Sequence, residues 1–530
     1  IKSLFTRYDS LKIKFLGQAG ISIKTKTSHL VCDPWFSDTG GFLARWHQFP
    51  PNEIIPKEYL HNCDYLYISH EHHDHFDREF LNSFPKDITI LIANFQTKEF
   101  RDEFKSMGFS KIIEINDWQK IKLSVDLEVM LVSDPGKYKE DSSLLILSDG
   151  FKILNKNDCY HSKDYMEKFA SIGIDLLFTQ FSGAIWYPMI YNYDEETKKK
   201  STKKVRTRLN EYFINVVNSI KPKYVIPSAG PPCFLEDDCF QFNFHENGIF
   251  PDQQDIIPEI DGKLFSKYNM MQPDDNIILN STSGINFENK HTFDFSNKES
   301  LLLDYQKKRL PVIKKYLNQI PAPKHDIYEN FCNFFNDIFN YSSYFTSKVE
   351  QLVEFEVTGN FGGNWQIDFN EKYPKIYDHI IKEPNYKFIL DSKYMNLILN
   401  EQINWEDFLL SLRLNISRTP DVYNGSLFAL LQYGRSPLLV QRAENYELRS
   451  KSPTTINVQD NSKMYKIQKF CPHLGEDLKN ATLKDGILVC PRHQWNFDLN
   501  SCGKCIAGGN KDLPVYEITD LDEAENTGMA

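Results

Sequence analysis

Two short motifs near the C-terminus constrain this chain most, because each pairs a cysteine with a histidine. The first is Cys471-Pro-His473, and after sixteen intervening residues the second is Cys490-Pro-Arg-His493. Proline follows the cysteine in both motifs, so the two segments read as matching loops. Thiolates and imidazoles are preferred ligands of iron and zinc. The four side chains together therefore predict a metal site.

The order of these four donors favours an iron–sulfur cluster over zinc. In a 2Fe–2S centre of the Rieske type, two cysteines hold one iron and two histidines hold the other. Zinc is the alternative, because two cysteines and two histidines also bind it, but zinc fingers usually place both cysteines first. Here the two residue types alternate, and segments 503–509 and 513–515 resemble the turn and strand that close Rieske domains. We therefore predict a Rieske cluster on Cys471, His473, Cys490 and His493.

Length and composition predict a multidomain protein with large apolar cores. The chain has 530 residues, of which 41% are hydrophobic and 25% charged. Its ten cysteines are scattered, unlike a disulfide framework, and no apolar run is long enough to span a bilayer. The first residues lack the profile of a signal peptide, so we expect a cytoplasmic protein without a membrane partner. The net charge of −11 argues against nucleic-acid binding.

A second cluster of metal ligands follows an apolar strand predicted at residues 64–69. The chain continues directly as His70-Glu71-His72-His73-Asp74-His75. Imidazoles at alternate positions of an extended segment face the same way, so His70 and His72 can share one metal ion. Asp74 and His75 lie one step further and can reach an adjacent position. A solvated histidine-rich loop is the alternative, but so many histidines directly after a buried strand favour a metal site.

A strand followed by this loop resembles the metallo-β-lactamase fold, and Asp158 fits the bridging aspartate of that fold. Hydrolases of this fold carry further histidines near residues 133–137 and after the strand at 224–228, and both are missing here. Two histidines and one carboxylate form the facial triad of non-haem Fe(II) oxygenases. His70, His72 and Asp158 could form this triad, and so could His72 or His75 with Asp74. The sequence leaves this choice open.

Basic residues elsewhere are candidates for binding an anionic substrate. Residues 196–219 predict a helix with one apolar face and a run of lysines and arginines, which is either a solvated face or a phosphate-binding edge. A further amphipathic helix is expected around residues 405–414. Arg413 and Arg418 either bind substrate anions or pair locally, and Lys137 is a third candidate.

The two halves together resemble the CMP-N-acetylneuraminic acid hydroxylases and the bacterial UDP-N-acetylmuramic acid hydroxylases. The resemblance rests on segments 32–35, 64–75, 153–159, 180–188, 227–230 and 413–423 together with the cluster motifs. In the animal sialic acid enzymes the Rieske domain comes first, whereas here it comes last. This difference bears on the substrate more than on the chemistry.

The resemblance implies O₂-dependent hydroxylation of an N-acetyl group to N-glycolyl on a nucleotide-activated amino sugar. It implies a Rieske cluster that passes electrons to a mononuclear non-haem Fe(II), with O₂ as co-substrate. An external donor is expected, a ferredoxin or cytochrome b5 with its reductase, because the sequence has no Gly-x-Gly-x-x-Gly motif for a flavin or nicotinamide. Homo-oligomerisation is left open.

The expected fold class is α+β, an αββα sandwich of metallo-β-lactamase type with an all-β C-terminal Rieske domain. We expect the sandwich at 1–250, a mixed extension completing the catalytic domain at 251–435, the Rieske domain at 436–520 and a tail at 521–530. Three rival functions remain. They are an oxygenase of the same architecture acting on an amine or other natural product, a zinc-dependent hydrolase, and an electron-transfer protein that uses only the cluster.

Overall fold

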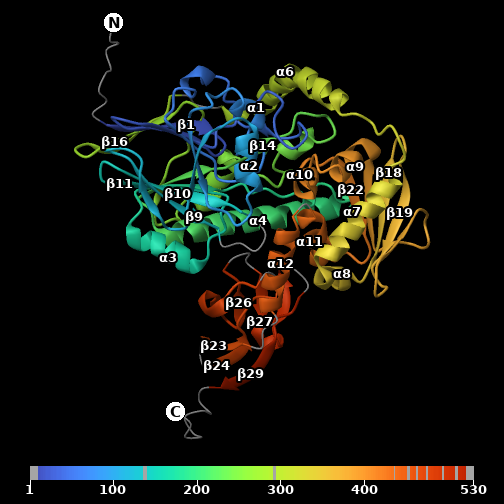
Figure 1. Ribbon diagram of the computed structural model, residues 1–530. Helices are drawn as coiled ribbons and strands as arrows, with labels where there is room; N and C mark the ends of the chain where they lie inside the picture. Colours follow the sequence, from blue (N-terminus) through green and yellow to red (C-terminus); the bar gives the residue numbers. More distant parts are fainter. Residues whose placement is uncertain are drawn as a thin grey trace. The chain divides into compact units, whose positions relative to one another are not determined.

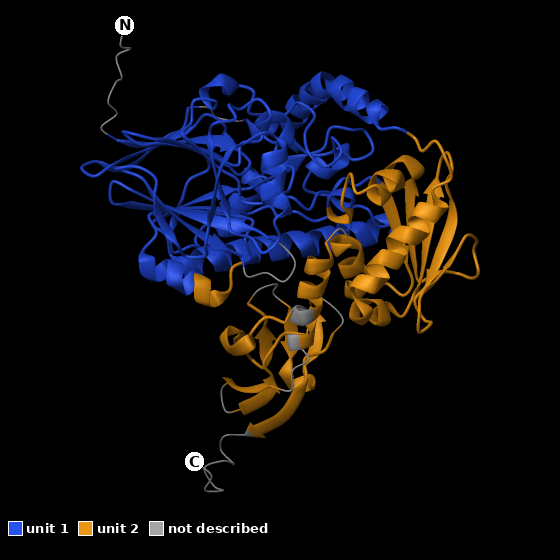
Figure 2. Ribbon diagram, viewed as in Figure 1, with its two compact units in different colours: residues 1–160, 166–321, 407–413 blue, residues 161–165, 322–406, 414–530 orange. Residues whose placement is uncertain are grey.

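The computed structural model describes residues 10–134, 140–290, 294–434, 436–450, 454–460, 463–472, 475–491, 495–507 and 511–520. The chain divides into two compact units (Figure 2). Unit 1 comprises residues 1–160, 166–321 and 407–413, and unit 2 comprises 161–165, 322–406 and 414–530. The short segment 407–413 thus belongs to unit 1, although the chain on both sides of it belongs to unit 2. The domain boundaries expected from the sequence stay predictions.

Two β-sheets form the centre of unit 1 (Figure 1). The first has the order β17-β16-β1-β2-β3-β5-β6-β7. Its strands are β1 (Leu11–Gly17), β2 (Gly20–Lys24), β3 (His29–Cys32), β5 (Tyr65–Tyr67), β6 (Thr89–Ala93), β7 (Lys111–Ile115), β16 (Asn276–Asn280) and β17 (Gly284–Glu288). Buried and half-buried residues alternate at the start of β1, as in a strand with one face toward the core.

The second sheet has the order β15-β13-β12-β11-β10-β9-β8. Its strands are β8 (Lys120–Lys122), β9 (Glu128–Ser133), β10 (Ser142–Ser148), β11 (Phe151–Asn157), β12 (Leu176–Gln180), β13 (Tyr224–Ser228) and β15 (Lys267–Tyr268). The interior strand β12 pairs in parallel with both neighbours and is buried throughout, as its apolar sequence predicts. A separate ribbon pairs β4 (His47–Gln48) with β14 (Pro232–Cys233).

One apolar core holds the two sheets together. It takes Leu11 and Val31 from the first sheet and Leu131 and Ile153 from the second. Helices cover the sheets: α2 adds Phe104 to the same core, and the α4 residue Tyr212 contacts Lys156 of β11. The helices up to residue 321 are η1 (Lys57–Tyr59), α1 (Arg78–Leu81), α2 (Glu99–Ser106), α3 (Lys163–Ile172), α4 (Glu195–Ile220), η2 (Phe240–Asn243), α5 (Gln253–Ile260), η3 (Phe295–Asn297) and α6 (Lys298–Gln319). The αββα arrangement expected from the sequence is confirmed.

Unit 2 contains a five-stranded sheet packed against helices. The sheet order is β20-β19-β18-β21-β22, with β18 (Leu352–Thr358), β19 (Gly363–Asp368), β20 (Lys375–Tyr377), β21 (Tyr386–Asp391) and β22 (Leu414–Arg418). Phe331 of α7 packs on Phe355 and Trp365 of this sheet, so α7 contributes to its aromatic core. The helices of unit 2 are α7 (Tyr328–Tyr341), α8 (Ser343–Val349), α9 (Ser392–Leu399), α11 (Gly425–Tyr433) and α12 (Pro437–Ser450). Helix α10 (Trp405–Leu410) lies mostly in the unit 1 segment 407–413.

The amphipathic helix expected around residues 405–414 is shorter than predicted. It is α10, which ends at Leu410, and Leu412 has a left-handed φ of 54° that cannot continue a right-handed helix. Strand β22 begins at Leu414. The apolar residues after Leu410 therefore pack as a turn and a strand.

The C-terminal part of unit 2 is built from two small sheets, which confirms the predicted all-β domain. One sheet has the order β23-β24-β29 and the other β25-β26-β27-β28. The elements are β23 (Thr455–Asp460), β24 (Lys463–Gln468), η4 (Leu478–Asn480), β25 (Thr482–Lys484), β26 (Ile487–Val489), β27 (Asn496–Asp498), η5 (Leu499–Ser501), β28 (Lys504–Ala507) and β29 (Val515–Asp520). Among the described helices, none combines the length and apolarity needed to cross a lipid bilayer.

Candidate metal centres

The histidine-rich loop of unit 1 is buried. It follows β5, and backbone N–H groups of His75 and Phe76 both donate to the carbonyl oxygen of His72, which closes a tight turn. His70, His72 and His75 are at most 4% exposed. The alternative of a solvated loop is therefore excluded by the burial of these side chains.

Three of the predicted ligands come together in this loop region. The ligand atoms of His70, His72 and Asp158 all lie within 4.8 Å of one another, and all three residues are buried. The His70 Nε2 and His72 Nδ1 atoms are 2.9 Å apart. Asp158 belongs to the second sheet's part of the chain, where it directly follows the last residue of β11. This group is the first of the triads that the sequence left open.

The remaining predicted ligands lie beside the same carboxylate. The His75 Nε2 atom is 3.5 Å from an Asp158 oxygen and 3.9 Å from an Asp74 oxygen. The Gln18 side chain donates to the same Asp74 oxygen at 3.0 Å. Asp158 thus lies between two donor sets, one with His70 and His72, the other with Asp74 and His75.

Two carboxylates that sequence reasoning missed orient the histidines. Asp33, directly after β3, accepts from the Ser69 N–H and hydroxyl and lies 2.9 Å from His75 Nδ1. An Asp141 oxygen lies 3.1 Å from His70 Nδ1. Carboxylates on the far nitrogen of a metal-binding histidine fix its tautomer and ring orientation. Two signals pointed to Asp33: it lies at a strand end, as His70 does, and it belongs to the resemblance segment 32–35.

The electrostatics at His75 favour a positive charge in this pocket. Burial opposes a charge on the imidazole, but the neighbouring Asp158 and Asp74 carboxylates outweigh it and raise the pKa of His75 well above its usual value. A metal cation would supply the positive charge that these carboxylates favour.

His73 has a different role, because it connects the loop to a left-handed turn. Its Nδ1 accepts a hydrogen bond from the Phe42 backbone N–H at 2.9 Å, and the two rings stack at 5.1 Å. Its Nε2 lies 3.7 Å from an Asp407 oxygen. Phe42, Leu43 and Ala44 have φ values of 49°, 55° and 60°, a rare left-handed run without glycine.

Arg413 supports this left-handed turn. Its Nε and Nη2 donate to the Leu43 carbonyl at 3.1 and 2.9 Å, and Nη2 also donates to Glu236 at 2.6 Å. Arg418 donates to Asp421 at 2.6 Å. Arg418 therefore has a local partner, whereas the partners of Arg413 are distant in the sequence. Their binding to a substrate stays a prediction, and Lys137 lies outside the described residues.

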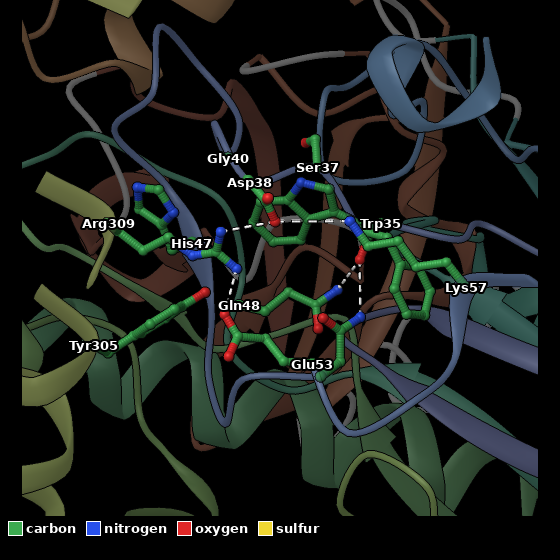
Figure 3. Close-up of a pocket in the computed structure, with 12 residues that line it drawn as sticks. Trp35, Ser37, Asp38, Gly40, His47, Gln48, Glu53, Lys57, Tyr305 and Arg309 are labelled. Carbon is green, nitrogen blue, oxygen red and sulfur yellow. Dashed lines mark hydrogen bonds and ion pairs between the residues drawn. The ribbon is translucent and has the colours of Figure 1, made fainter. Parts of the chain in front are cut away.

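A small pocket beside this region is closed by ion pairs. Arg309 of α6 binds Asp38 at 2.7 Å and Glu53 at 2.6 Å, next to His47 and Tyr305 (Figure 3). Its cavity volume of about 20 Å³ has room for one water molecule. The pocket is therefore too small for a sugar.

The cluster motifs of unit 2 form two matching loops. The N–H of Cys471 donates to the carbonyl of Glu476, and the N–H of Cys490 donates to that of Trp495. The two loops therefore close over the same number of residues. Both cysteines are 1% exposed and belong to the core of the all-β domain. The two predicted histidine ligands, His473 and His493, lie outside the described residues.

The residues of both sites fit the groups that the sequence predicts. Two buried imidazoles and a carboxylate in unit 1 are the donor set of a mononuclear non-haem iron. Buried cysteines at the start of two matching loops suit one iron of a 2Fe–2S cluster.

Comparison with known proteins finds two domain families in this chain. The family described as "Beta-lactamase superfamily domain" matches residues 12–229, and the family described as "Rieske [2Fe-2S] domain" matches residues 438–517. The Rieske match confirms the predicted 2Fe–2S cofactor and the position of its domain at the C-terminus.

Curated relatives match large parts of the chain. A Rieske 2Fe-2S iron–sulfur protein of Mycolicibacterium smegmatis is 26% identical over 538 residues, 96% of this chain and 100% of the relative. Cytidine monophosphate-N-acetylneuraminic acid hydroxylase of Xenopus laevis is 23% identical over 455 residues, 78% of this chain and 70% of the relative.

Among solved structures, Igni18, a metallo hydrolase of Ignicoccus hospitalis, is similar with a TM-score of 0.35 and 15% identity. The likeness covers 51% of this chain and 98% of that one, and it is too distant to bear on the chemistry. The chain is therefore an iron–sulfur enzyme of the oxygenase type that joins a β-lactamase superfamily domain to a C-terminal Rieske domain, and it is related to the cytidine monophosphate-N-acetylneuraminic acid hydroxylases.

Proposed function

We propose that this protein hydroxylates the N-acetyl methyl group of a nucleotide-activated amino sugar, of the CMP-N-acetylneuraminic or UDP-N-acetylmuramic acid type. The observation that carries the proposal is the buried group of His70, His72 and Asp158 on a chain that also has a Rieske domain. The relationship to cytidine monophosphate-N-acetylneuraminic acid hydroxylase supports this substrate class. One oxygen atom of O₂ enters the new hydroxyl group and the other leaves as water, which consumes two electrons and two protons.

His70, His72 and Asp158 would hold a mononuclear iron, and Asp74 and His75 stand beside them. When bound, the cluster supplies single electrons and the iron activates O₂. Asp141 and Asp33 hold the rings of His70 and His75 in fixed orientations. The burial of all these side chains excludes bulk water, which protects a reactive site from side reactions.

Electrons would come from a ferredoxin or from cytochrome b5 with its reductase. This partner is proposed because a Rieske hydroxylation needs an outside source of electrons, and the nucleotide sugar supplies none. A hydrolase would need neither O₂ nor reductant.

The proposal is tested with holoprotein purified without oxygen. It is supplied with ferredoxin, ferredoxin reductase, NADPH and either nucleotide sugar, and then exposed to ¹⁸O₂. We expect a product that has gained one labelled oxygen atom in its acyl group, detected by mass spectrometry. The Asp158→Ala variant and an argon-flushed sample should give none. Hydrolysed product under argon, or zinc in place of iron in the active protein, would contradict the proposal.

A further inference from the structure

Three lysines line a cavity on the β1–β2 hairpin of unit 1. The cavity has a volume of about 300 Å³ and is lined by Lys12, Lys14, Lys24, Ile55, Pro56 and Tyr59. Lys12 and Lys14 occupy alternate positions of β1 and so share its outer face. Lys24 ends β2 on the same face, because it pairs directly with Lys12 in the antiparallel register.

The charges around this cavity are not balanced. Lys14 pairs with Asp274, whose other oxygen binds Lys290 at 3.1 Å. Among the residues that the structure describes, Lys12 and Lys24 have no carboxylate within ion-pair distance. Like charges placed directly opposite one another on paired strands destabilise a sheet. Asp274 thus pairs with Lys14 and Lys290, and no ion pair within the described part of the chain balances Lys12 or Lys24, on a chain whose net charge is −11.

Contacts with Tyr59 hold one ammonium group at the cavity wall. The Lys24 Nζ lies 3.9 Å from the centre of the Tyr59 ring. The ring packs at 5.3 Å against His29, and its hydroxyl accepts a hydrogen bond from Ser22. Lys24 is therefore positioned before any ligand arrives. Burial, and then the neighbouring Lys12 and Lys14, lower the pKa of Lys24, as expected where positive charge is crowded.

This cavity is separate from the metal centre. Strand β3 begins at His29, which pairs with Lys24, and ends at Cys32 just before Asp33. Asp33 orients His75, so the lysines stand at the opposite end of the strand from the metal ligands.

We propose that the cavity is a second, non-catalytic site for a phosphate-bearing anion. Lysine ammonium groups are point charges that bind phosphate oxygens by charge-assisted hydrogen bonds. A dianionic group between Lys12 and Lys24 would replace their repulsion with two attractions. The volume lies at the lower end of the range for ligand pockets, and it suits a pyrophosphate-sized group.

The test measures inorganic pyrophosphate binding to the holoprotein by isothermal titration calorimetry at low ionic strength. The Lys12→Met/Lys24→Met variant is compared with wild type. Lys26→Met serves as the matched control, since Lys26 is exposed and lies 4.0 Å from Asp149. We expect saturable binding to wild type and Lys26→Met, and at least tenfold weaker binding to the double variant. Any pyrophosphate that binds at the iron gives the same background in all three proteins. The proposal is therefore judged on the part of the binding that the lysine substitutions remove.

Thermal unfolding without ligand checks the fold of the double variant. Its Tm should equal or exceed that of wild type, because the substitution removes a like-charge pair. If the Tm of the double variant is lower than that of wild type, the single variant Lys24→Gln is measured in its place. The same loss of pyrophosphate binding is expected. Equal pyrophosphate affinity in wild type and a folded lysine variant, or no saturable binding to wild type, would overturn the proposal.

Discussion

An Asp158 oxygen lies 3.5 Å from Nε2 of His75, and both side chains are buried. Asp158 also belongs to the group with His70 and His72. One carboxylate therefore faces two sets of nitrogen donors that the histidine-rich loop supplies. This shared position makes Asp158 the residue whose loss should affect the metal centre most.

The first prediction concerns iron content. Asp158→Ala removes the carboxylate from the donor set, so we expect loss of the mononuclear iron while the Rieske cluster remains. Total iron should fall from about three to about two atoms per chain. Metal analysis combined with electron paramagnetic resonance of the reduced cluster measures both. Asp149→Asn, at an exposed turn, is the control. Unchanged iron in Asp158→Ala would contradict the assignment.

The second prediction concerns the orientation of His75. Asp33→Asn keeps the shape of the side chain that lies 2.9 Å from His75 Nδ1, but it removes the charge. Loss of such a partner typically weakens metal binding about 10–100-fold. Iron retention during dialysis against a chelator measures this effect. A role limited to folding would instead lower Tm and leave the iron of the folded fraction unchanged.

The third prediction concerns the cluster. Cys490→Ser removes a buried thiolate at the start of its loop, so the visible absorption and the O₂-dependent activity should both be lost. Iron should then fall to about one atom per chain, held in unit 1. Cys502→Ser is a suitable control, because Cys502 is exposed in the same domain. Product formation at the normal rate by Cys490→Ser would exclude electron delivery through the cluster.

The fourth prediction separates the two alternatives for Arg413. Its guanidinium binds the Leu43 carbonyl and Glu236, so Arg413→Met should lower the free energy of unfolding by about 1–3 kcal/mol. If Arg413 supports the turn, Tm falls while KM for the nucleotide sugar stays the same. A rise in KM without a change in Tm would instead indicate contact with the substrate.

The fifth prediction concerns pH and His47, beside the pocket of Figure 3. Burial lowers the pKa of His47 to about 3, below its ordinary value of 6.5. Between these values the unfolded chain binds the extra proton, so stability falls as pH falls from 6.5 toward 3. The slope for one histidine is about 1.4 kcal/mol per pH unit. His47→Gln should reduce the slope of unfolding free energy against pH by about this amount, measured by urea titration. An unchanged slope would refute a buried neutral imidazole.

Several features could be predicted from the sequence because their residues are neighbours along the chain. His70, His72, Asp74 and His75 follow one apolar strand, and the spacing alone places them in one loop. The cysteine motifs predicted two matching loops for the same reason, and the sandwich followed from the apolar strands and the resemblance.

Only the tertiary structure determined which distant residues meet these local motifs. Asp33 and Asp141 approach the histidines from other strands, and Arg413 reaches Glu236 across 177 positions. Sequence spacing specifies the direction of a side chain within one element, but contacts between elements depend on how the sheets and loops pack. The same limit applies to the three lysines of β1 and β2. In the sequence each of these lysines is typical of a surface position. Only the pairing of β1 with β2 places their charges close together.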